Sequence, residues 1–431
     1  MSTTLTTLPA PLPALREEPK PSRRTDVLLV SILLLAVSVR LAWRVHKGGP
    51  DFWVNGYSFF YDLASNVAAG NGLYIEGGGW AMRMPAYPLF LALTALVGKN
   101  YLWIIIPQAI MGAGTVLCAF LIGRELFGQT TGILASILTA LYPYYVVHDT
   151  ALQETGMFTF MTALSVFLLL KARRGSSLLV WTLAGLALGA AVLTRQTLAP
   201  FGGAALLWLI LFGEGSRRQR LLRCAAVFLP LSVMVGSWLA RNYRLVGAPV
   251  LTSEFGRQLW NANNAKTFSH YPGESIDRSA GEAFAAFTPT ERRQLDALGD
   301  NEIRESDWFL RKGLGYITDH PLETLQSGAR KIAAGFSWSF NPTREPLVQL
   351  TYLFSYAPIS ILGSLGMILT WRQWREHGPI YLLFLTFTAV TAIFWAHTSH
   401  RSYLDIYWMV FAAYVLNRLF GQRVAAWGIA T

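Results

Sequence analysis

The chain has 431 residues, of which 53% are hydrophobic and only 14% are charged. Soluble proteins carry about 25% charged residues, so this composition excludes an ordinary soluble domain, and repeated apolar runs of roughly 18 to 24 residues predict an all-α polytopic membrane protein. The formal net charge of +11 comes mainly from Lys and Arg clusters between those runs. Such clusters set membrane topology and contact lipid headgroups, so we expect membrane lipids and no nucleic acid as partners.

Ten apolar segments along the chain are candidate membrane spans and predict about ten transmembrane helices. They cover 26–44, 101–123, 129–147, 154–170, 178–194, 197–213, 222–240, 347–370, 379–396 and 402–420. Before them, residues 1–25 are polar and rich in proline, which predicts a disordered cytoplasmic tail and no cleavable signal peptide. The spans form an N-terminal transmembrane catalytic core over 26–240 and C-terminal transmembrane helices over 347–420, followed by a cytoplasmic tail over 421–431.

The first outer loop, 46–100, contains an apolar piece over 87–97 that is too short to cross a core about 30 Å thick. We predict a re-entrant or interfacial helix there, because this choice places the later Lys and Arg clusters on the cytoplasmic side. Those clusters lie at Arg124, Lys171 to Arg174, Arg217 to Arg223, Arg372 to Arg375 and Arg418 to Arg423. Both termini are then cytoplasmic.

Residues 241–346 form one long hydrophilic segment of about 105 residues, which we predict to be a folded extracytoplasmic loop domain. The Thr-Pro-Thr-Glu stretch at 288–291 indicates a helix N-cap followed by an acidic first turn. Helices are expected over 289–298, 302–318 and 321–335. A segment that forms helices with capped ends is predicted to be folded rather than a tail.

Three carboxylates at the outer side are candidate catalytic groups, because an ionised side chain beside a span is costly to desolvate. Asp51 and Asp62 come from the first outer loop, and Glu154 precedes an apolar run. Carboxylates from two loops suit either a general base with its orienting partner or a divalent-metal site around an acceptor hydroxyl. The structural alternatives are a surface residue for Asp51, a helix-face residue for Asp62 and an N-terminal helix residue for Glu154.

Four basic residues near the outer ends of spans are candidates for binding a donor phosphate. They are Arg195, Arg241, His397 and Arg401. Arg suits bidentate phosphate recognition, and Arg195 interrupts an otherwise apolar helix hairpin. The alternatives are interfacial snorkelling for Arg241 and an interfacial turn for His397 and Arg401.

A further set of polar and aromatic residues is assigned to binding of the sugar or the acceptor. It comprises Arg83, Tyr87, Trp260, Asn261 and Asn263. Amide side chains hydrogen-bond to sugars and aromatic rings stack on them, whereas turn residues are the simpler interpretation of the Asn cluster. The sequence has no Walker A, strand-to-helix GxGxxG, HExxH or CxxC motif, which argues against ATP-driven transport and nicotinamide chemistry. We predict no certain cofactor and leave a divalent metal open.

Several short pieces occur in an order that resembles a known class of membrane enzyme. They are YDLASNVAAGNGLY and RMPAYP in the first outer loop, GRELFG after the second span, LYPYYVVHDTALQE, LTRQT, WLARNYRLVGAPVLTSEFG with LWNANN, YITDHPLETLQSGARK, and HTSHRSYLDIY near the C-terminus. The ordered set resembles the GT-C class of integral-membrane glycosyltransferases that use a polyprenyl-phosphate sugar. Within that class it is similar to bacterial relatives of protein O-mannosyltransferases and lipid A aminoarabinose transferases, described as RgtA/B/C/D-like.

This resemblance implies a reaction on the periplasmic or outer face of a bacterial inner membrane. A sugar would pass from a polyprenyl-phosphate donor to a glycan, lipid or protein acceptor with inversion, and a first-loop carboxylate would act as base. Glu154 matches the second acidic position of the family, and Arg195 and Arg241 match cations near the donor phosphate. The first-loop acid of the family falls on Tyr57 in this chain, so Asp51 or Asp62 would have to replace it.

Two other functions remain open at the level of sequence. The first is a transporter or flippase of lipid-linked sugars, against which stand the gathering of polar residues at one face and the lack of an inverted repeat. The second is a catalytically inactive relative that binds polyprenyl phosphate, which Tyr57 favours.

Overall fold

The structure is a computed structural model that describes residues 23–76, 79–173 and 177–426. Ten helices build a bundle, and each overlaps one predicted span. They are α1 (Arg23–Val54), α4 (Tyr101–Phe127), α5 (Gln129–Leu141), α7 (Thr155–Arg173), α8 (Leu178–Thr194), α9 (Ala199–Phe212), α10 (Arg217–Val246), α16 (Pro346–Leu369), α17 (Gly378–Ile393) and α19 (Asp405–Ala426). The prediction of an all-α polytopic membrane protein is therefore confirmed.

Five of these helices are long and apolar enough to cross a membrane by length and composition. They are α1, α4, α7, α10 and α16. The shorter α5 is extended after Tyr142 by α6 (Pro143–His148), which carries the chain to the end of the bundle. Residues 1–22 of the predicted N-terminal tail and 427–431 of the predicted C-terminal tail lie outside the described residues.

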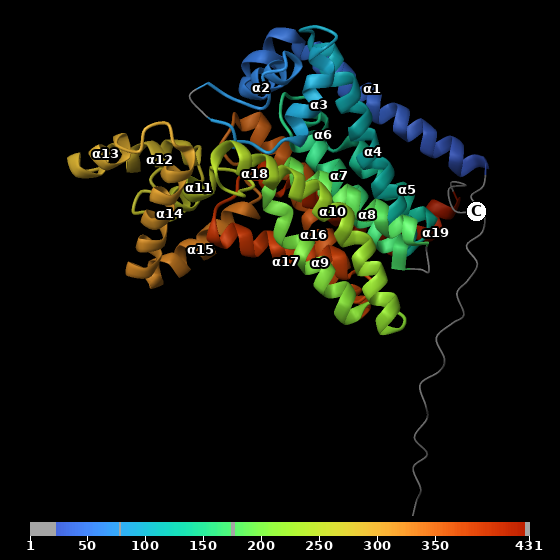
Figure 1. Ribbon diagram of the computed structural model, residues 1–431. Coiled ribbons are helices and arrows are strands. Elements are labelled where there is room, and N and C mark those ends of the chain that lie inside the picture. The colour runs from blue at the N-terminus through green and yellow to red at the C-terminus, as the bar shows by residue number, and fades with distance from the viewer. Residues whose placement is uncertain (1–22, 77–78, 174–176, 427–431) are drawn as a thin grey trace, which may run out of the picture.

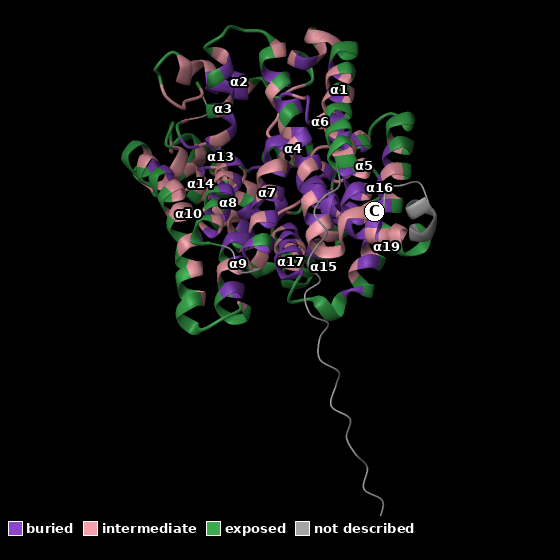
Figure 2. Ribbon diagram, turned by 90° about the vertical axis from the view of Figure 1, so that its right-hand side faces the viewer, coloured by how far each residue is buried: buried purple, intermediate pink, exposed green. Residues whose placement is uncertain are grey.

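The middle of the bundle is a continuous buried core, whereas its outer helices expose apolar side chains (Figure 2). In α19, Ile406 and Tyr407 are fully buried. On α10 and α16, by contrast, Val233 and Phe354 are 71% and 72% exposed. Apolar side chains that face outward from a polytopic bundle are the surface that meets lipid.

Glycines allow α16 to approach α19 closely. A Cβ at Gly363 would lie 2.6 Å from atoms of Trp408, and one at Gly366 would lie 2.5 Å from the carbonyl oxygen of Phe411. Small residues at such contacts allow helix backbones to pack tightly in membranes, where no hydrophobic force drives helices together. This contact fixes α19 in the centre of the bundle.

Both ends of the described chain lie at one end of the bundle. Thr25 of α1 accepts a hydrogen bond from Gln129, and Asn417 of α19 donates one to Thr131, 3.2 Å away. Because α5 begins with these two partners, α1 starts beside the place where α19 ends (Figure 1). Basic residues also lie at the end of α7 and at the start of α10. Counted along the chain from helix to helix, both of these helix ends fall on the same side of the bundle as the start of α1.

The first outer loop and the long hydrophilic segment come together at the opposite end of the bundle (Figure 1). The loop contributes α2 (Ser58–Ala68) and α3 (Ala86–Ala95), which pack against each other. With ten residues, α3 is about 15 Å long and too short to cross a bilayer, as predicted. At Gly48 a φ of 80° interrupts α1 and redirects the chain into this loop.

The long segment folds into five helices. They are α11 (Phe255–Ala262), α12 (Ile276–Ala285), α13 (Pro289–Asp296), α14 (Glu302–Asp319) and α15 (Pro321–Gly335). Thr288 accepts a hydrogen bond from the Glu291 amide and forms a capping box, so the predicted start of α13 is confirmed. Trp260, Phe287 and Phe309 form a small apolar core that holds these helices together.

Candidate active site

An ion pair between Glu154 and Arg195 forms the centre of the candidate site. The Nε atom of Arg195 lies 2.8 Å from Oε1 of Glu154, and the two side chains are 11% and 17% exposed. Arg195 also donates to the Ser399 carbonyl oxygen at 3.0 Å and to the Thr155 hydroxyl at 2.9 Å. One guanidinium thereby joins the ends of α7 and α8 to the turn before α19.

Local sequence explains why Arg195 lies there. Its backbone is extended, with φ −142° and ψ 120°, and it ends α8. A short 3₁₀ turn over Gln196–Leu198 follows, and Pro200 then occupies the first turn of α9, where a missing N–H costs nothing. The side chain therefore leaves the hairpin between α8 and α9 at the bundle end, above the ring of Phe158.

The first outer loop reaches this ion pair through Tyr57. The Tyr57 amide donates to the Leu152 carbonyl oxygen at 3.0 Å, two residues before Glu154. A Cβ at Gly56 would lie 2.5 Å from the Leu152 side chain, so only glycine allows this approach. Tyr57 is 55% exposed.

Two further charged residues that the sequence did not single out, Asp277 and Arg344, act on Tyr57 through their charge. Desolvation and the negative charge of Glu154 raise the pKa of Tyr57, Asp277 adds to this effect, and Arg195 and Arg344 oppose it. Asp277 lies in the first turn of α12, and Arg344 lies just before α16. Both lie in a segment of mixed charges, so no sequence pattern distinguishes them.

His397 has a structural position between α12 and the turn before α19. Its ring accepts a hydrogen bond from the Ile276 amide at 3.3 Å, and its backbone amide donates to Nδ1 of His400 at 3.0 Å. Burial lowers the pKa of His397 to about 4, so its ring is neutral at neutral pH. The structure thus places His397 beside the site without the positive charge that the sequence analysis expected of it.

Arg401 is enclosed in the core of the bundle. It is fully buried, forms an ion pair with Asp405, and donates to the Tyr352 hydroxyl at 2.6 Å. Because this charge is already matched and no part of the side chain is exposed, the geometry corrects the expectation that Arg401 contacts a phosphate.

Arg241 is bound to the first outer loop. Its guanidinium donates to the carbonyl oxygens of Leu73 at 2.7 Å and Trp80 at 2.5 Å, and it lies over the Trp238 ring. From the other side, Glu302 of α14 accepts hydrogen bonds from the Trp80 and Ala81 amides at 2.8 and 3.1 Å. Arg241 and Glu302 together form a clamp on this part of the loop.

Among the described residues, neither first-loop carboxylate contacts Glu154. Asp51 accepts hydrogen bonds of 2.7 Å from both Arg44 and Asn55. Desolvation raises the pKa of Asp51, but the Asn55 and Arg44 contacts outweigh it, so the pKa is below its usual value. Asp62 lies on the exposed face of α2.

The residues assigned to the sugar or acceptor are divided between the surface and the core. Arg83, within the first outer loop, lies over the Phe59 ring and 4.0 Å from Glu254. Tyr87 is buried and donates to Gln108 at 3.1 Å.

The other three, in contrast, belong to the core of the long segment. Trp260 packs on Phe287 and Phe309, and Asn263 donates to the Ile393 carbonyl oxygen at 2.9 Å. Asn261 is buried as well. The structure therefore corrects the expectation that these three side chains face a bound sugar.

The described residues around Glu154 do not form a set of ligands for a divalent metal. Among the described residues, no three His, Cys, Asp or Glu side chains come close enough to hold an ion. Glu154 is already paired with the cation Arg195, which does not fit a metal site. We derive no step through a metal.

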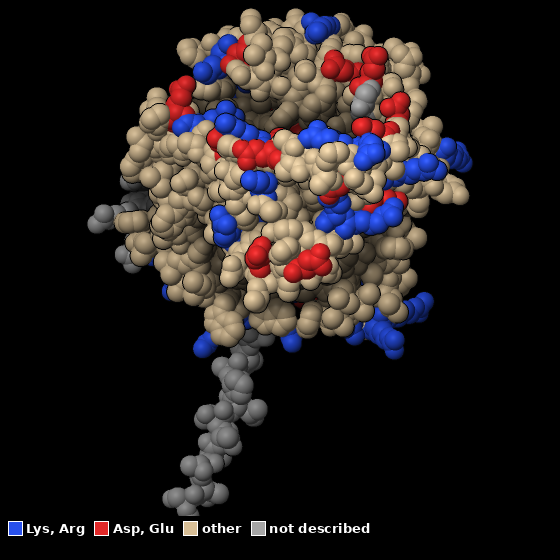
Figure 3. All heavy atoms as spheres, turned by 90° about the vertical axis from the view of Figure 1, so that its left-hand side faces the viewer, with Lys and Arg blue, Asp and Glu red and all other residues tan. Residues whose placement is uncertain are grey.

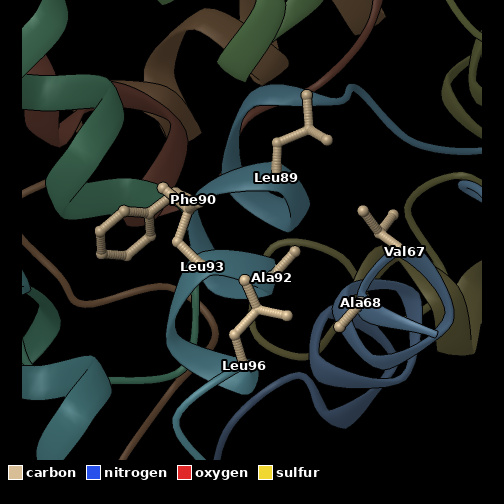
Figure 4. A pocket seen from close by; sticks show the side chains of 7 residues that line it. All are labelled: Val67, Ala68, Leu89, Phe90, Ala92, Leu93 and Leu96. Carbon is tan, nitrogen blue, oxygen red and sulfur yellow. The ribbon is translucent and has the colours of Figure 1, made fainter. Parts of the chain in front are cut away.

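Charged side chains gather on the end of the molecule formed by the long segment, and a hollow opens beside them (Figure 3). A separate apolar slot of about 420 Å³ lies between α2 and α3. Figure 4 shows that its labelled lining consists of hydrocarbon side chains alone. They are Val67, Ala68, Leu89, Phe90, Ala92, Leu93 and Leu96.

The membrane bundle, with its first loop and long segment closing over charged residues at one end, resembles the fold of solved oligosaccharyltransferases. Residues 83–238 match the family model of the dolichyl-phosphate-mannose-protein mannosyltransferases, a stretch that contains Glu154 and Arg195.

One curated relative and two solved structures illustrate this similarity. The mannosyltransferase-type protein YkcB of Bacillus subtilis (strain 168) is 25% identical over 234 residues, which are 51% of this chain and 31% of YkcB. The oligosaccharyltransferase AglB of Archaeoglobus fulgidus, solved with an inhibitory peptide and a dolichol-phosphate, superposes with a TM-score of 0.60 and 14% identity over 94% of this chain and 51% of AglB. Its apo form gives a TM-score of 0.59, 16% identity and coverages of 94% and 52%. The chain thus spans about half of AglB and about a third of YkcB.

Proposed function

We propose that this protein is a glycosyltransferase that moves a sugar from a polyprenyl-phosphate donor to an envelope acceptor on the outer face of a bacterial inner membrane. The observation that carries the proposal is the Glu154–Arg195 pair, held where the first outer loop meets the bundle and inside the segment that matches the mannosyltransferase family. The dolichol-phosphate bound to AglB, which shares the fold, supports a donor of this chemical class.

The distribution of charge supports the outer orientation that we propose. Arg124, Lys171 and Arg217 lie at the end of the bundle opposite the site, and short loops rich in Lys and Arg stay in the cytoplasm. The site then faces the periplasmic or outer side.

The reaction would be an inverting displacement at the anomeric carbon. The acceptor oxygen forms the new bond to that carbon as the bond to the donor phosphate oxygen breaks, and the phosphate keeps the electron pair. The acceptor hydroxyl gives its proton to a carboxylate, for which Asp51, Asp62 and Glu154 are the candidates. A phosphate leaving group needs no proton, so stabilising its negative charge is the larger electrostatic task.

The donor lipid would lie along the apolar side of the first outer loop. On α3, Leu89 and Leu93 are exposed on one face and line the slot against α2. A lining of hydrocarbon side chains suits a prenyl chain, so we assign the 85–97 segment to a wall of the donor groove.

A second candidate function, binding of polyprenyl phosphate without turnover, is favoured by one observation. Tyr57 replaces the first-loop acid, and its hydroxyl has a raised pKa, so it is a poor base at neutral pH. If none of Asp51, Asp62 and Glu154 reaches the acceptor, the chain would bind the donor without transferring the sugar.

The test is sugar release from a panel of radiolabelled polyprenyl-phosphate sugars by purified protein in lipid nanodiscs. Wild type is compared with Glu154→Gln, Asp51→Asn and Asp62→Asn, and with Glu214→Gln as a control at the other end of the bundle. We expect one donor to be used, a loss of about 100-fold or more in Glu154→Gln, and an equal loss in whichever Asp variant removes the base. Donor binding without turnover in wild type would establish the second candidate, and turnover unchanged in Glu154→Gln would contradict our site.

A further inference from the structure

The basic side chains around the Glu154–Arg195 pair differ in whether they already form an ion pair or a hydrogen bond. Arg195 is paired with Glu154 at 2.8 Å. Arg83 has Glu254 at 4.0 Å, and Arg241 binds two loop carbonyl oxygens. Arg344 is exposed and, within the described part of the chain, has no hydrogen bond or ion pair. At the edge of a site that we propose to hold a phosphate, Arg344 is therefore a guanidinium whose hydrogen-bond donors are not yet used.

The segment before α16 is fixed to the site by several contacts. The Phe340 ring lies 5.9 Å from the ring of Tyr144 and 6.1 Å from that of His148, centroid to centroid. The Thr343 amide donates to the Gly273 carbonyl oxygen at 2.8 Å, which ties the segment to the residues just before α12. These contacts place Arg344 between the end of α6 and the start of α12.

The charge of Arg344 acts on groups of the site itself. It influences the Tyr57 hydroxyl together with Glu154, Arg195 and Asp277, and it also influences His148. Tyr57 in turn is held by its backbone two residues from Glu154. Arg344 is therefore within electrostatic reach of the place where we propose that the donor reacts.

We propose that Arg344 binds the phosphate of the polyprenyl-phosphate donor and stabilises it as the leaving group. This inference rests on the function proposed above. When the anomeric bond breaks, the phosphate oxygen gains the electron pair and a negative charge, while Arg344 remains protonated and gives up no proton. A guanidinium can contact two phosphate oxygens at once, and its charge is not offset here by a carboxylate.

The experiment measures the affinity of polyprenyl phosphate, which carries no sugar, for the full chain in nanodiscs. Wild type is compared with Arg344→Gln, with Arg344→Lys and with Arg293→Gln, a matched charge loss on the exposed helix α13. We expect Arg344→Gln to weaken binding about 10-fold to 100-fold, since a hydrogen-bonded charged group contributes about 1.5 to 3 kcal/mol. Arg344→Lys should recover only part of this affinity, because the ammonium lacks the planar fork.

A neutral probe separates a phosphate contact from a structural role. Polyprenol without phosphate should bind Arg344→Gln as it binds wild type, and the melting temperature should not change because the side chain is exposed. Equal affinity of wild type and Arg344→Gln for polyprenyl phosphate would overturn this inference and leave the proposed function standing. If wild type itself shows no affinity for polyprenyl phosphate, the proposed function fails and the inference fails with it.

Discussion

At the residue scale, Arg195 is more than a counter-ion for Glu154. Its three nitrogens contact the Glu154 carboxylate, the Ser399 carbonyl and the Thr155 hydroxyl, in geometry that only a planar guanidinium provides. Removing one member of a largely buried pair leaves the other charge without a partner. The pair should therefore stabilise the fold as well as the site.

A double-mutant cycle tests this. We predict that Arg195→Gln lowers the free energy of unfolding by about 2 kcal/mol, and that adding Glu154→Gln recovers part of the loss because no unpaired carboxylate remains. Arg195→Lys should behave more like Arg195→Gln than like wild type. Thermal unfolding in nanodiscs measures wild type, Arg195→Gln, Glu154→Gln and the double variant, with Arg195→Lys beside them, and strictly additive effects of the two Gln changes would contradict direct pairing.

The buried Lys331 leads to a prediction of how the stability of the fold depends on pH. It is fully buried in α15, and its ammonium donates to the Ala262 and Ile393 carbonyl oxygens and to Asn263, at 3.1 to 3.2 Å. Within the described ranges of the chain it forms no ion pair with a carboxylate. Burial lowers the pKa of Lys331 to about 8, whereas an unfolded Lys titrates near 10.4. Between these values the unfolded chain binds the proton that the folded chain has lost, so raising the pH favours the fold.

We therefore expect wild type to gain stability relative to Lys331→Met as the pH rises from about 8 to about 10, by an amount on the order of 3 kcal/mol over the full window. Melting temperatures of both proteins at several pH values in this range provide the comparison. A difference that stays constant or shrinks with rising pH would show that the ammonium is not destabilised by its burial.

At the element scale, the clamp made by Arg241 and Glu302 connects three parts of the fold. It joins the end of α10 and the start of α14 to the first outer loop at Trp80 and Ala81. The Ser253 hydroxyl donates to the same Glu302 carboxylate at 2.6 Å. The loop position therefore depends on a carboxylate more than 200 residues away in the chain.

Hydrogen exchange measures this connection. In Glu302→Ala the Trp80 and Ala81 amides lose their acceptor, and their exchange should accelerate by about 10-fold or more, because local opening needs less free energy. Glu305→Ala on the same helix, which breaks only a pair with Arg257, is the matched control. Similar exchange at these amides in both variants would show that the clamp does not hold the loop.

The sequence predicted elements better than it predicted the site, and the reason is physical. Apolar run length and the Thr288 cap are local signals, so all ten spans and α13 could be placed from composition and neighbouring residues. Whether a polar side chain faces a cavity or the core depends on distant partners. Trp260 and Asn263 look like sugar contacts in sequence, but Phe309 and Ile393 cover them in the fold.

The residues of the candidate site show the same limit of prediction from sequence, because their relative positions depend on the fold. Glu154 and Arg195 were predicted separately, from a carboxylate beside an apolar run and an Arg within one, and the fold pairs them. Arg344 and Asp277 carry no such signal, because each is a single charge among many in the long segment. Only the packing of α12 and of the residues before α16 brings them to Tyr57.

At the scale of the whole molecule, the charge distribution predicts an orientation. In a protein without its native Cys118 and Cys224, a cysteine at Thr290 in α13 should react with an impermeant maleimide added to intact cells. A cysteine at Glu214, in the turn between α9 and α10, should react only after permeabilisation. The reverse pattern would place the candidate site in the cytoplasm and contradict the proposed reaction on a lipid-linked donor outside.

The central claim is that this bundle cleaves a polyprenyl-phosphate sugar rather than carrying it across the membrane. The most direct measurement follows one radiolabelled donor in proteoliposomes and separates free polyprenyl phosphate from intact donor in each leaflet. Our account predicts that wild type releases polyprenyl phosphate as the sugar leaves, and that Glu154→Gln, with the ion pair to Arg195 altered, does not. Movement of intact donor between leaflets without any cleavage would contradict the account and favour a transporter.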